Sequence, residues 1–413
     1  MKENSAQFTS KLWSINYVFL LLANIAIYLA FYMIVPTIAG HTKDIGGSSL
    51  EASLAISIFS ITSLAFRLIS GNAADKMGKK PIAVIGIAVC IVSTISYYFV
   101  PVTGLLLMRI LQGVGWGMSS AAVGAAFSDI VAPDRRGEGL GYYSLTMAVS
   151  MSLAPLVAIM IMNGPGFNIV LATSITFLII GIPLLEMAGI SERGVKQDTS
   201  DKTPLVDWKN LFEKRALLPG LLCFICVITL CAIMSYIYLF GKEIKMTNIW
   251  IYFLGHVTMV LITRPFVGKI FDKKGHKVVI IPGAICMGLG VFLLSLTNSI
   301  GTLIIASLFF GFGYGATQPS LLAWAVNRSP ANRKGAATGT ILCSMDLSFT
   351  LGPFILSFIA DKTSYAVMYR LSSVLMVLFL VIYLINIVGR KKSVIGEKVN
   401  VNLEQKINLE QNV

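Results

Sequence analysis

The chain has 413 residues, of which 55% are hydrophobic and only 13% charged, whereas roughly 25% of the residues in a typical soluble domain are charged. This composition excludes an ordinary soluble protein. The net charge of +13 does not indicate a nucleic-acid partner, because the Lys and Arg residues lie in short segments between apolar runs.

The apolar residues form runs of roughly 20, the length that crosses about 30 Å of hydrocarbon as an α-helix. Barrel strands would show about 10 residues of strict alternation, which the chain lacks, so the runs predict helices. The first run has no small-residue cleavage site and is expected to be retained as the first helix. Twelve spans are expected, at residues 13–37, 50–72, 80–100, 103–127, 137–163, 167–189, 217–241, 249–271, 278–297, 301–326, 335–360 and 364–388.

The basic residues predict the orientation of these spans. With the N-terminus in the cytoplasm, the loops facing outside hold only four basic residues, which are Lys43, Lys242, Lys245 and Lys362. Both termini are therefore expected in the cytoplasm, in a multi-pass protein of the plasma membrane. The short loops fit a bacterial inner membrane.

One loop is long and divides the chain. Residues 190–216 carry charges of both signs and are interpreted as a cytoplasmic linker. The linker separates an N-terminal six-helix bundle at residues 1–189 from a C-terminal six-helix bundle at residues 217–390. A polar cytoplasmic tail at residues 391–413 is expected to follow.

The two halves repeat a pattern of residues at a nearly constant offset. The segment from Arg67 to Lys80 recurs from Arg264 to Lys277, with six identical positions at an offset of 197. A run of alternating glycines in helix 4 recurs in helix 10 at an offset of 198. Many transporters are built from such duplicated units. The expected fold is an all-α integral membrane protein with twelve transmembrane helices in two pseudo-symmetric six-helix bundles.

The repeated segments resemble motifs of a known family. The sequence GNAADKMGKK, at residues 71–80, is similar to the signature between helices 2 and 3 of the major facilitator superfamily. The sequence RILQGVG, at residues 109–115, is similar to that family's helix 4 motif. The chain most resembles the twelve-helix drug:proton antiporters and metabolite exporters, although Leu153-Ala154-Pro155 in helix 5 departs from the Gly-Pro pattern of that group.

The resemblance implies a gating role for the repeated segments. Helix 2 is expected to end at Gly71, with Asp75 one turn later, where the resemblance implies contacts with the start of helix 11 and the Arg135–Arg136 segment. Such contacts would hold the cytoplasmic side shut and break when it opens. The alternative is that the charges only fix the topology. The candidate gating residues are Gly71, Asp75, Gly78, Lys79, Arg136, Gly268, Asp272, Gly275 and Arg333.

Three ionisable side chains inside the spans are candidates for proton coupling, since such residues cost about 2.5–3.5 kcal/mol each to insert. Arg109 matches an arginine linked to proton coupling in the family and is expected to hydrogen-bond in the central cavity; a structural bridge is the alternative. Asp346 is the one carboxylate deep in the bundle and could bind and release a proton, or form a structural pair with a distant Arg. His256 could titrate near neutral pH or serve only in packing.

Aromatic and polar side chains near mid-span suit a cavity for amphipathic organic solutes, although packing explains each of them equally well. The candidates are Asn24, Tyr28, Tyr32, Trp116, Tyr236, Tyr238, Gln318 and Trp324. No metal or cofactor site is expected, because Cys223 and Cys226 lack accompanying metal ligands and the glycine run of helix 4 follows no strand. No phosphate-binding loop or catalytic motif indicates ATP-driven transport or an enzyme.

The sequence therefore predicts proton-coupled efflux of a drug or metabolite by alternating access. The expected partners are the small-molecule substrate, protons and the lipid bilayer, with the protein working as a monomer and without nucleic acid. One alternative is a proton symporter or facilitator that imports a sugar or organic acid. Another is a transporter-like membrane sensor or structural protein.

Overall fold

The computed structural model describes residues 12–131, 135–190, 213–330 and 333–386 of the chain. The described part is helical and contains no strand. Most of the predicted linker and the whole predicted tail at 391–413 lie outside the described residues.

Twelve long helices correspond to the predicted spans, so the predicted fold class is confirmed. The first bundle contains α1 (Ile15–Asp44), α2 (Ser49–Met77), α3 (Lys79–Ser96), α4 (Val102–Ile130), α5 (Arg136–Asn163) and α6 (Phe167–Met187). The second contains α7 (Leu217–Glu243), α8 (Ile251–Lys274), α9 (Lys277–Ser295), α10 (Ile300–Arg328), α11 (Lys334–Lys362) and a last helix, Tyr365–Asn386. Short 3₁₀ turns, η2 (Lys214–Ala216) and η3 (Thr247–Trp250), precede α7 and α8.

Eleven of the described helices are long and apolar enough to cross a membrane, and α4 is not among them. It has the length, with 29 residues, but carries Arg109, Gln112 and several glycines in its first half. Both polar side chains are buried inside the protein. The bundle therefore shields these two polar side chains of α4 from lipid, while apolar residues such as Leu107 stay exposed.

The prediction that helix 2 ends at Gly71 is wrong. The helix α2 continues through Gly71 and Asp75 to Met77 and ends at Gly78, whose φ is 100°. In the second bundle α8 likewise continues to Lys274 and ends at Gly275, with φ 78°. Polar residues can extend a helix beyond the hydrocarbon, and a glycine ends it because only glycine adopts positive φ without strain. The candidate gating segments are thus helix ends rather than loops.

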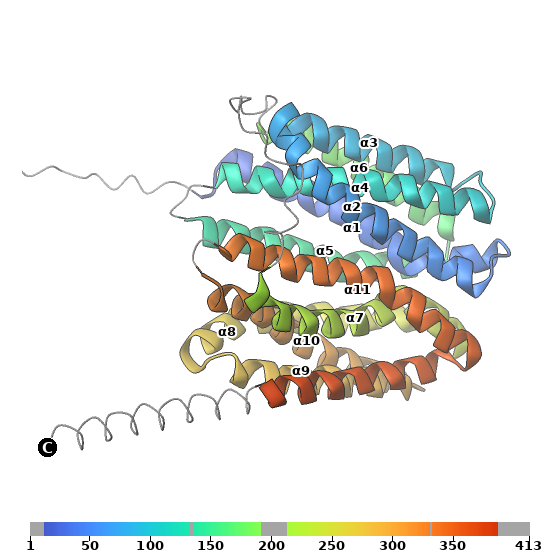
Figure 1. Ribbon diagram of the computed structural model, residues 1–413. Coiled ribbons are helices and arrows are strands. Elements are labelled where there is room, and N and C mark those ends of the chain that lie inside the picture. The colour runs from blue at the N-terminus through green and yellow to red at the C-terminus, as the bar shows by residue number, and fades with distance from the viewer. Residues whose placement is uncertain (1–11, 132–134, 191–212, 331–332, 387–413) are drawn as a thin grey trace, which may run out of the picture.

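The bundles are held internally by matching helix pairs. In the first, α1 packs on α5 and α6, and α4 packs on α2 and α3. In the second, α7 packs on α11, and α10 packs on α8 and α9. The bundles meet where α2 contacts α11, α5 contacts α8 and α1 contacts α7. Figure 1 shows the bundles one above the other, with their long helices running in similar directions.

Glycines let the equivalent helices of both bundles approach closely. A Cβ atom on Gly115 of α4 would lie 2.5 Å from the carbonyl oxygen of Gly86 on α3. A Cβ atom on Gly313 of α10 would lie 2.5 Å from the carbonyl oxygen of Gly283 on α9. Both distances are impossible for a real Cβ, so the glycine runs are used for helix packing, as in other membrane bundles.

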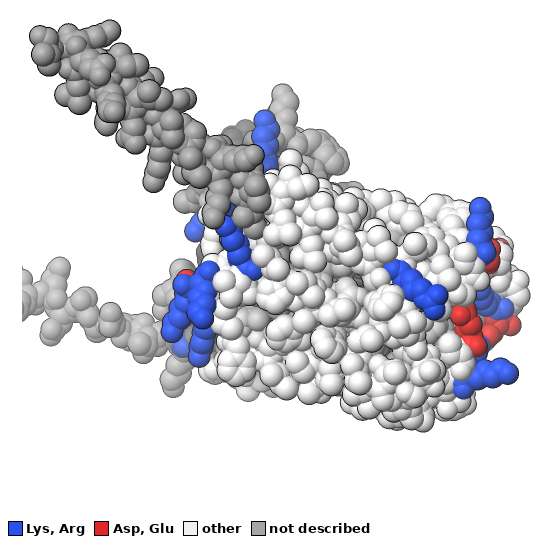
Figure 2. Space-filling model, turned by 90° about the horizontal axis from the view of Figure 1, so that it is seen from below, with Lys and Arg blue, Asp and Glu red and all other residues white. Residues whose placement is uncertain are grey.

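Charged side chains gather at the two ends of the face shown in Figure 2, with a wide, largely uncharged belt between them. We call the end where α1 begins and the last helix finishes the terminal end, and the opposite one the distal end. The C-terminal ends of α2 and α8, which Gly78 and Gly275 cap, lie at the terminal end, on the left in Figure 1. The uncharged belt has the distribution expected of a surface in contact with lipid.

Candidate functional site

An ion pair joins the two bundles where α2 meets α11. Arg67 Nη1 lies 2.7 Å from Asp346 Oδ2, and the two side chains are 28% and 22% exposed. Structural pairing with a distant Arg was one alternative for Asp346, and Arg67 is that partner. Sequence reasoning did not select Arg67, although it is the first residue of the repeated segment.

Aromatic side chains of the first bundle lie near Arg67. Tyr28, Tyr32 and Tyr143 lie within electrostatic reach of Arg67. The ring of Tyr28 contacts that of Trp116 edge-on at 4.9 Å, and Phe31 stacks on Trp116 at 4.2 Å. The predicted cavity residues Tyr28, Tyr32 and Trp116 are thus brought together beside the bundle interface.

A second set of polar contacts crosses the interface where α5 meets α8. Ser152 Oγ lies 3.1 Å from His256 Nδ1, and Asn163 Nδ2 donates to the carbonyl oxygen of Thr247 at 2.7 Å. His256 is only 2% exposed, and its Nε2 has no partner. The candidate histidine therefore lies at the interface, where it joins α8 to the other bundle.

Arg264 reaches across the same interface. Its Nη1 donates to the carbonyl oxygen of Ser144 on α5 at 3.2 Å, and its Nε is buried without a partner. By the repeat offset of 197, Arg264 is the counterpart of Arg67. Both arginines therefore cross from one bundle to the other, but only Arg67 meets a carboxylate among the described residues.

Arg109 lies inside the first bundle rather than between the bundles. It is fully buried, its Nε donates to the carbonyl oxygen of Ala55, and its Nη1 donates to Gln112 Oε1. Its guanidinium lies over the ring of Phe59, with 4.4 Å to the centroid. Tyr97 also donates to Gln112 Oε1, at 2.8 Å. Arg109 was expected in a central cavity, but it lies between helices of one bundle. Its role in proton coupling remains a prediction.

The remaining cavity candidates are spread over the molecule. Asn24 Nδ2 donates to Thr146 Oγ1 at 2.7 Å within the first bundle. Tyr236 donates to the carbonyl oxygen of Pro353 at 2.6 Å, and Gln318 Nε2 lies 3.7 Å from Met345 Sδ. Trp324 stacks on His276 at 4.6 Å, and Lys242 lies over the ring of Tyr238. The role of these residues in a substrate cavity stays a prediction.

Polar contacts between the bundles also hold the distal end together. Lys242 Nζ pairs with Asp44 Oδ1 at 2.9 Å, which links α7 to α1. Ser49 Oγ donates to Asp361 Oδ1 at 2.5 Å, which links α2 to α11. Lys43 Nζ donates to the hydroxyl of Tyr365 at 3.3 Å. These contacts close the bundles against each other at this end.

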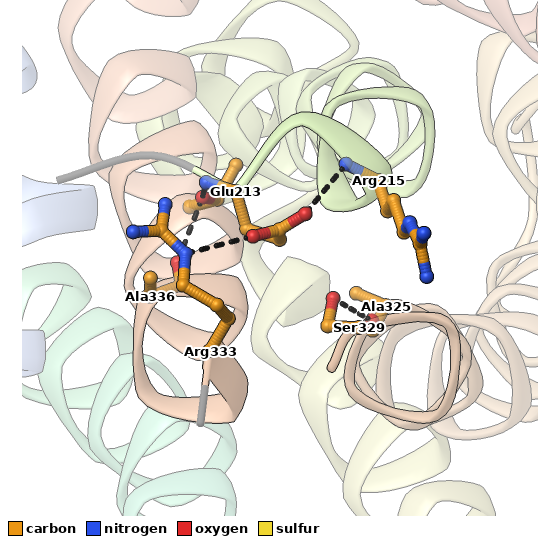
Figure 3. Close-up of polar contacts among 7 residues, drawn as sticks. Glu213, Arg215, Ala325, Ser329, Arg333 and Ala336 are labelled. Carbon is orange, nitrogen blue, oxygen red and sulfur yellow. Dashed lines mark hydrogen bonds and ion pairs between the residues drawn. The ribbon is translucent and has the colours of Figure 1, made fainter. Parts of the chain in front are cut away.

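Three ion pairs of the described residues at the terminal end each join residues of the same bundle, and one of them is Lys80 with Glu186 at 4.0 Å. Lys79, one of the candidate gating residues, pairs with Asp129 of α4. Arg333, another candidate, pairs with Glu213 at 2.9 Å, and Figure 3 shows Arg333 and Arg215 on either side of the Glu213 carboxylate. The hydrogen bond from Arg333, with a second from the Arg215 backbone, holds the pKa of Glu213 below its usual range.

The other candidate gating residues are placed only in part. Asp272 is exposed, and Gly268 is an exposed residue of α8. Gly71, Asp75 and Arg136 lie in α2 and α5, but their side chains lie outside what the structure describes. The predicted contact between Asp75 and the start of α11 therefore stays a prediction.

Two helical bundles related by duplication, with charged and aromatic side chains where they meet, define the architecture of a secondary transporter. The chain belongs to the Major Facilitator Superfamily, whose model matches residues 20–342 and 249–405. The protein is accordingly a membrane transporter and not an enzyme.

Individual relatives agree with this assignment. An uncharacterised MFS-type transporter of Methanocaldococcus jannaschii is 24% identical over 354 residues, covering 83% of this chain and 90% of that protein. The staphylopine export protein of Staphylococcus aureus is 21% identical over 361 residues, covering 83% and 88%. The solved structure of the nucleoside transporter NupG superposes with a TM-score of 0.72 at 12% identity, over 89% of this chain and 100% of that chain, and shows a shared fold.

Proposed function

We propose that the protein exports a small organic compound in exchange for protons, by alternating access between its two bundles. The observation that carries the proposal is the Arg67–Asp346 ion pair, because it joins α2 to α11 and contains a carboxylate that can take up a proton. The similarity to a staphylopine export protein supports the outward direction.

Protonation of Asp346 would weaken the contact between the bundles. The ionised carboxylate accepts a charge-assisted hydrogen bond from Arg67, and the neutral acid loses most of that attraction. With the pair broken, α2 and α11 can separate at the terminal end while the distal end rearranges. The proton is released again when Asp346 faces the opposite side and Arg67 returns, so each cycle carries one proton past the interface.

The terminal end faces the cytoplasm in this proposal, because its loops and helix ends hold most of the Lys and Arg residues. The protein then lies in the plasma membrane with both termini inside. Gly78 and Gly275 would act as the short joints between α2 and α3 and between α8 and α9, where a bundle can tilt without breaking a helix.

Reconstituted protein tests the exchange directly. Proteoliposomes with an imposed pH gradient are challenged with compounds to which a deletion strain has become sensitive, and internal pH is followed with a trapped dye. Wild-type protein is expected to dissipate the gradient when compound is present on the side that drives antiport. Dissipation from the opposite side would identify proton symport, which is the import alternative.

The Asp346→Asn variant is expected to lose compound-dependent proton movement by at least about 100-fold, because an amide cannot exchange a proton at this position. Glu186→Gln is the matched control, since the Glu186 side chain is 59% exposed and its ion pair, with Lys80 at 4.0 Å, is long and within the first bundle. Full proton exchange by a well-folded Asp346→Asn protein would overturn the proposal.

A further inference from the structure

Arg264 is a partly buried cation whose counter-charge is missing. In the part of the chain that the structure describes, no carboxylate forms an ion pair with it. Among the described residues its one hydrogen bond is to the carbonyl oxygen of Ser144, and its buried Nε has no partner there. A guanidinium inside a membrane protein is costly to insert, so an uncompensated one indicates a binding role.

The repeat explains why the counter-charge is missing. The carboxylate that faces Arg67 is Asp346, and its counterpart at an offset of 198 is Ala148 on α5. Ala148 lies one helical turn from Ser144, whose carbonyl oxygen accepts from Arg264. The second bundle thus places the Asp346 carboxylate against Arg67 of the first bundle. The equivalent position of the first bundle places only the methyl group of Ala148 near Arg264.

The free edge of Arg264 has the geometry for a carboxylate. A guanidinium can donate from Nε and one terminal nitrogen to both oxygens of a carboxylate, in a bidentate pair. The contact with Ser144 uses Nη1 and leaves the Nε edge available. Once movement of the bundles uncovers the buried Nε, an incoming carboxylate can bind Arg264 without displacing the existing hydrogen bond.

Two tyrosines connect this arginine to the proton-accepting pair. Tyr32 lies within electrostatic reach of Asp346 and Arg67, and Tyr314 lies within reach of both Arg264 and Tyr32. Arg67 and Arg264 also occupy equivalent positions of the repeat and both cross the bundle interface, so the two arginines and Asp346 face the same region between the bundles. In that region Arg264 can bind an anion and Asp346 can bind a cation, with aromatic rings between them.

We propose that the transported solute is a small zwitterion, whose carboxylate binds Arg264 and whose ammonium group competes with Arg67 for Asp346. The aromatic rings near Arg67 provide favourable surfaces for an ammonium group and for apolar substituents. This inference rests on the proposed exchange, and it explains the exchange: a proton on Asp346 removes the acceptor for the ammonium group, so proton and solute exclude each other.

Matched compounds test each half of the assignment. A panel of aromatic and aliphatic amino acids and dipeptides is used, each with its carboxamide, which lacks the carboxylate, and its N-acetyl derivative, which lacks the ammonium. Thermal stabilisation of purified full-length protein in detergent measures binding. Parent zwitterions are expected to stabilise the wild type, and the carboxamides to bind at least about tenfold more weakly.

Variants of Arg264 and Asp346 test whether these two side chains cause the weaker binding of the derivatives. Arg264→Gln is expected to abolish the preference for zwitterion over carboxamide, and Arg264→Lys to retain a weaker preference, since lysine keeps the charge without the bidentate edge. Asp346→Asn is expected to abolish the preference for zwitterion over N-acetyl derivative. Lys269→Gln removes a positive charge from an exposed position of the same helix and is expected to change neither.

Carboxamides that bind as well as their parents, or a panel without any ligand for the wild type, would overturn the inference without reference to any variant. An unchanged preference in a folded Arg264→Gln protein would do the same. Equilibrium binding needs no transport, so the two proposals fail separately. Selective binding without proton exchange removes the proposed function, whereas exchange without carboxylate preference removes only the zwitterion.

Discussion

The two bundles share their backbone packing and differ in their buried charges. Gly115 of α4 and Gly313 of α10 allow the same close helix contacts. Arg109, in contrast, is matched by Ser307, which donates to the carbonyl oxygen of Ile304 in its own helix at 2.7 Å. Small residues set how helices approach, and both bundles need that geometry. Charges are costly inside a membrane protein, and Arg109 is present in the first bundle only.

The same difference separates Arg67 from Arg264. Both arginines are retained at equivalent positions and both cross the bundle interface. Among the described residues only Arg67 is neutralised by an acid, so the interface is symmetrical in shape and asymmetrical in charge. A transporter needs equivalent bundles to tilt past each other, but it needs a particular place to bind a proton or a solute. The following four experiments test this division.

Restoring the missing acid would break the asymmetry most directly. Ala148→Asp places a carboxylate on the face of α5 that meets Arg264. A second ion pair is expected to hold the bundles together and to slow proton exchange about tenfold, which corresponds to roughly 1.4 kcal/mol. Initial rates in proteoliposomes measure this effect. Ala148→Asn has nearly the same shape without charge, and equal slowing by both variants would attribute the effect to size.

Removing Arg109 is expected to damage the stability of the first bundle. The side chain is fully buried and joins α4 to α2, so Arg109→Ala leaves a cavity and loses the bond to Ala55. Deletion of a large buried side chain costs about 2–5 kcal/mol. Ser307→Ala is the comparison in the second bundle and is expected to cost about 1 kcal/mol. Thermal unfolding in detergent compares the two, and equal losses would contradict the proposed difference.

The glycines should show the opposite behaviour, with equal effects in both bundles. Gly115→Ala and Gly313→Ala each force a Cβ against a backbone carbonyl oxygen at 2.5 Å. Overpacking of this kind costs about 1–3 kcal/mol. Melting temperatures of the two variants are therefore expected to fall together. A fall in one and not the other would show that the bundles tolerate helix separation differently.

The smallest expected effect concerns Glu213 at the terminal end. Its pKa is lowered by the hydrogen bond from Arg333, so the ion pair stabilises the protein above the ordinary Glu pKa of about 4.3 and loses that effect as pH falls through the lowered value. Glu213→Gln should melt slightly below the wild type from pH 5 to 8. The gap should close below about pH 4. A gap that persists in acid would exclude this ion pair as its cause.

Sequence reasoning predicted the helices well and the contacts of their polar residues poorly. The length of each apolar run determines where a span lies, because the hydrocarbon thickness sets it, and all twelve spans were predicted. The position at which α2 ends was missed, since Asp75 and its neighbours continue the helix in the polar region and only Gly78 stops it. A positive φ at that glycine is a backbone property that composition does not reveal.

The candidate site shows where local patterns stop being informative. Asp346 was selected because a carboxylate in an apolar run is rare, but its partner Arg67 is 279 residues away. The location of Arg67 in the repeated segment indicated a functional role, but the segment as a whole was interpreted as a gating motif. Trp324 was grouped with Trp116 by its mid-span position, whereas it stacks on His276 of the same bundle. Position along a helix does not determine which face is turned toward the other bundle.

The amino-acid sequence alone determined that this protein has twelve membrane helices in two duplicated bundles, because run length and repeat offset are properties of the chain itself. Only the tertiary structure decided which charges meet. The docking of α2 on α11 and of α5 on α8 gives Arg67 a carboxylate and leaves Arg264 with a carbonyl oxygen. That outcome depends on how the two bundles pack against each other, and the spacing of residues along either bundle does not determine it.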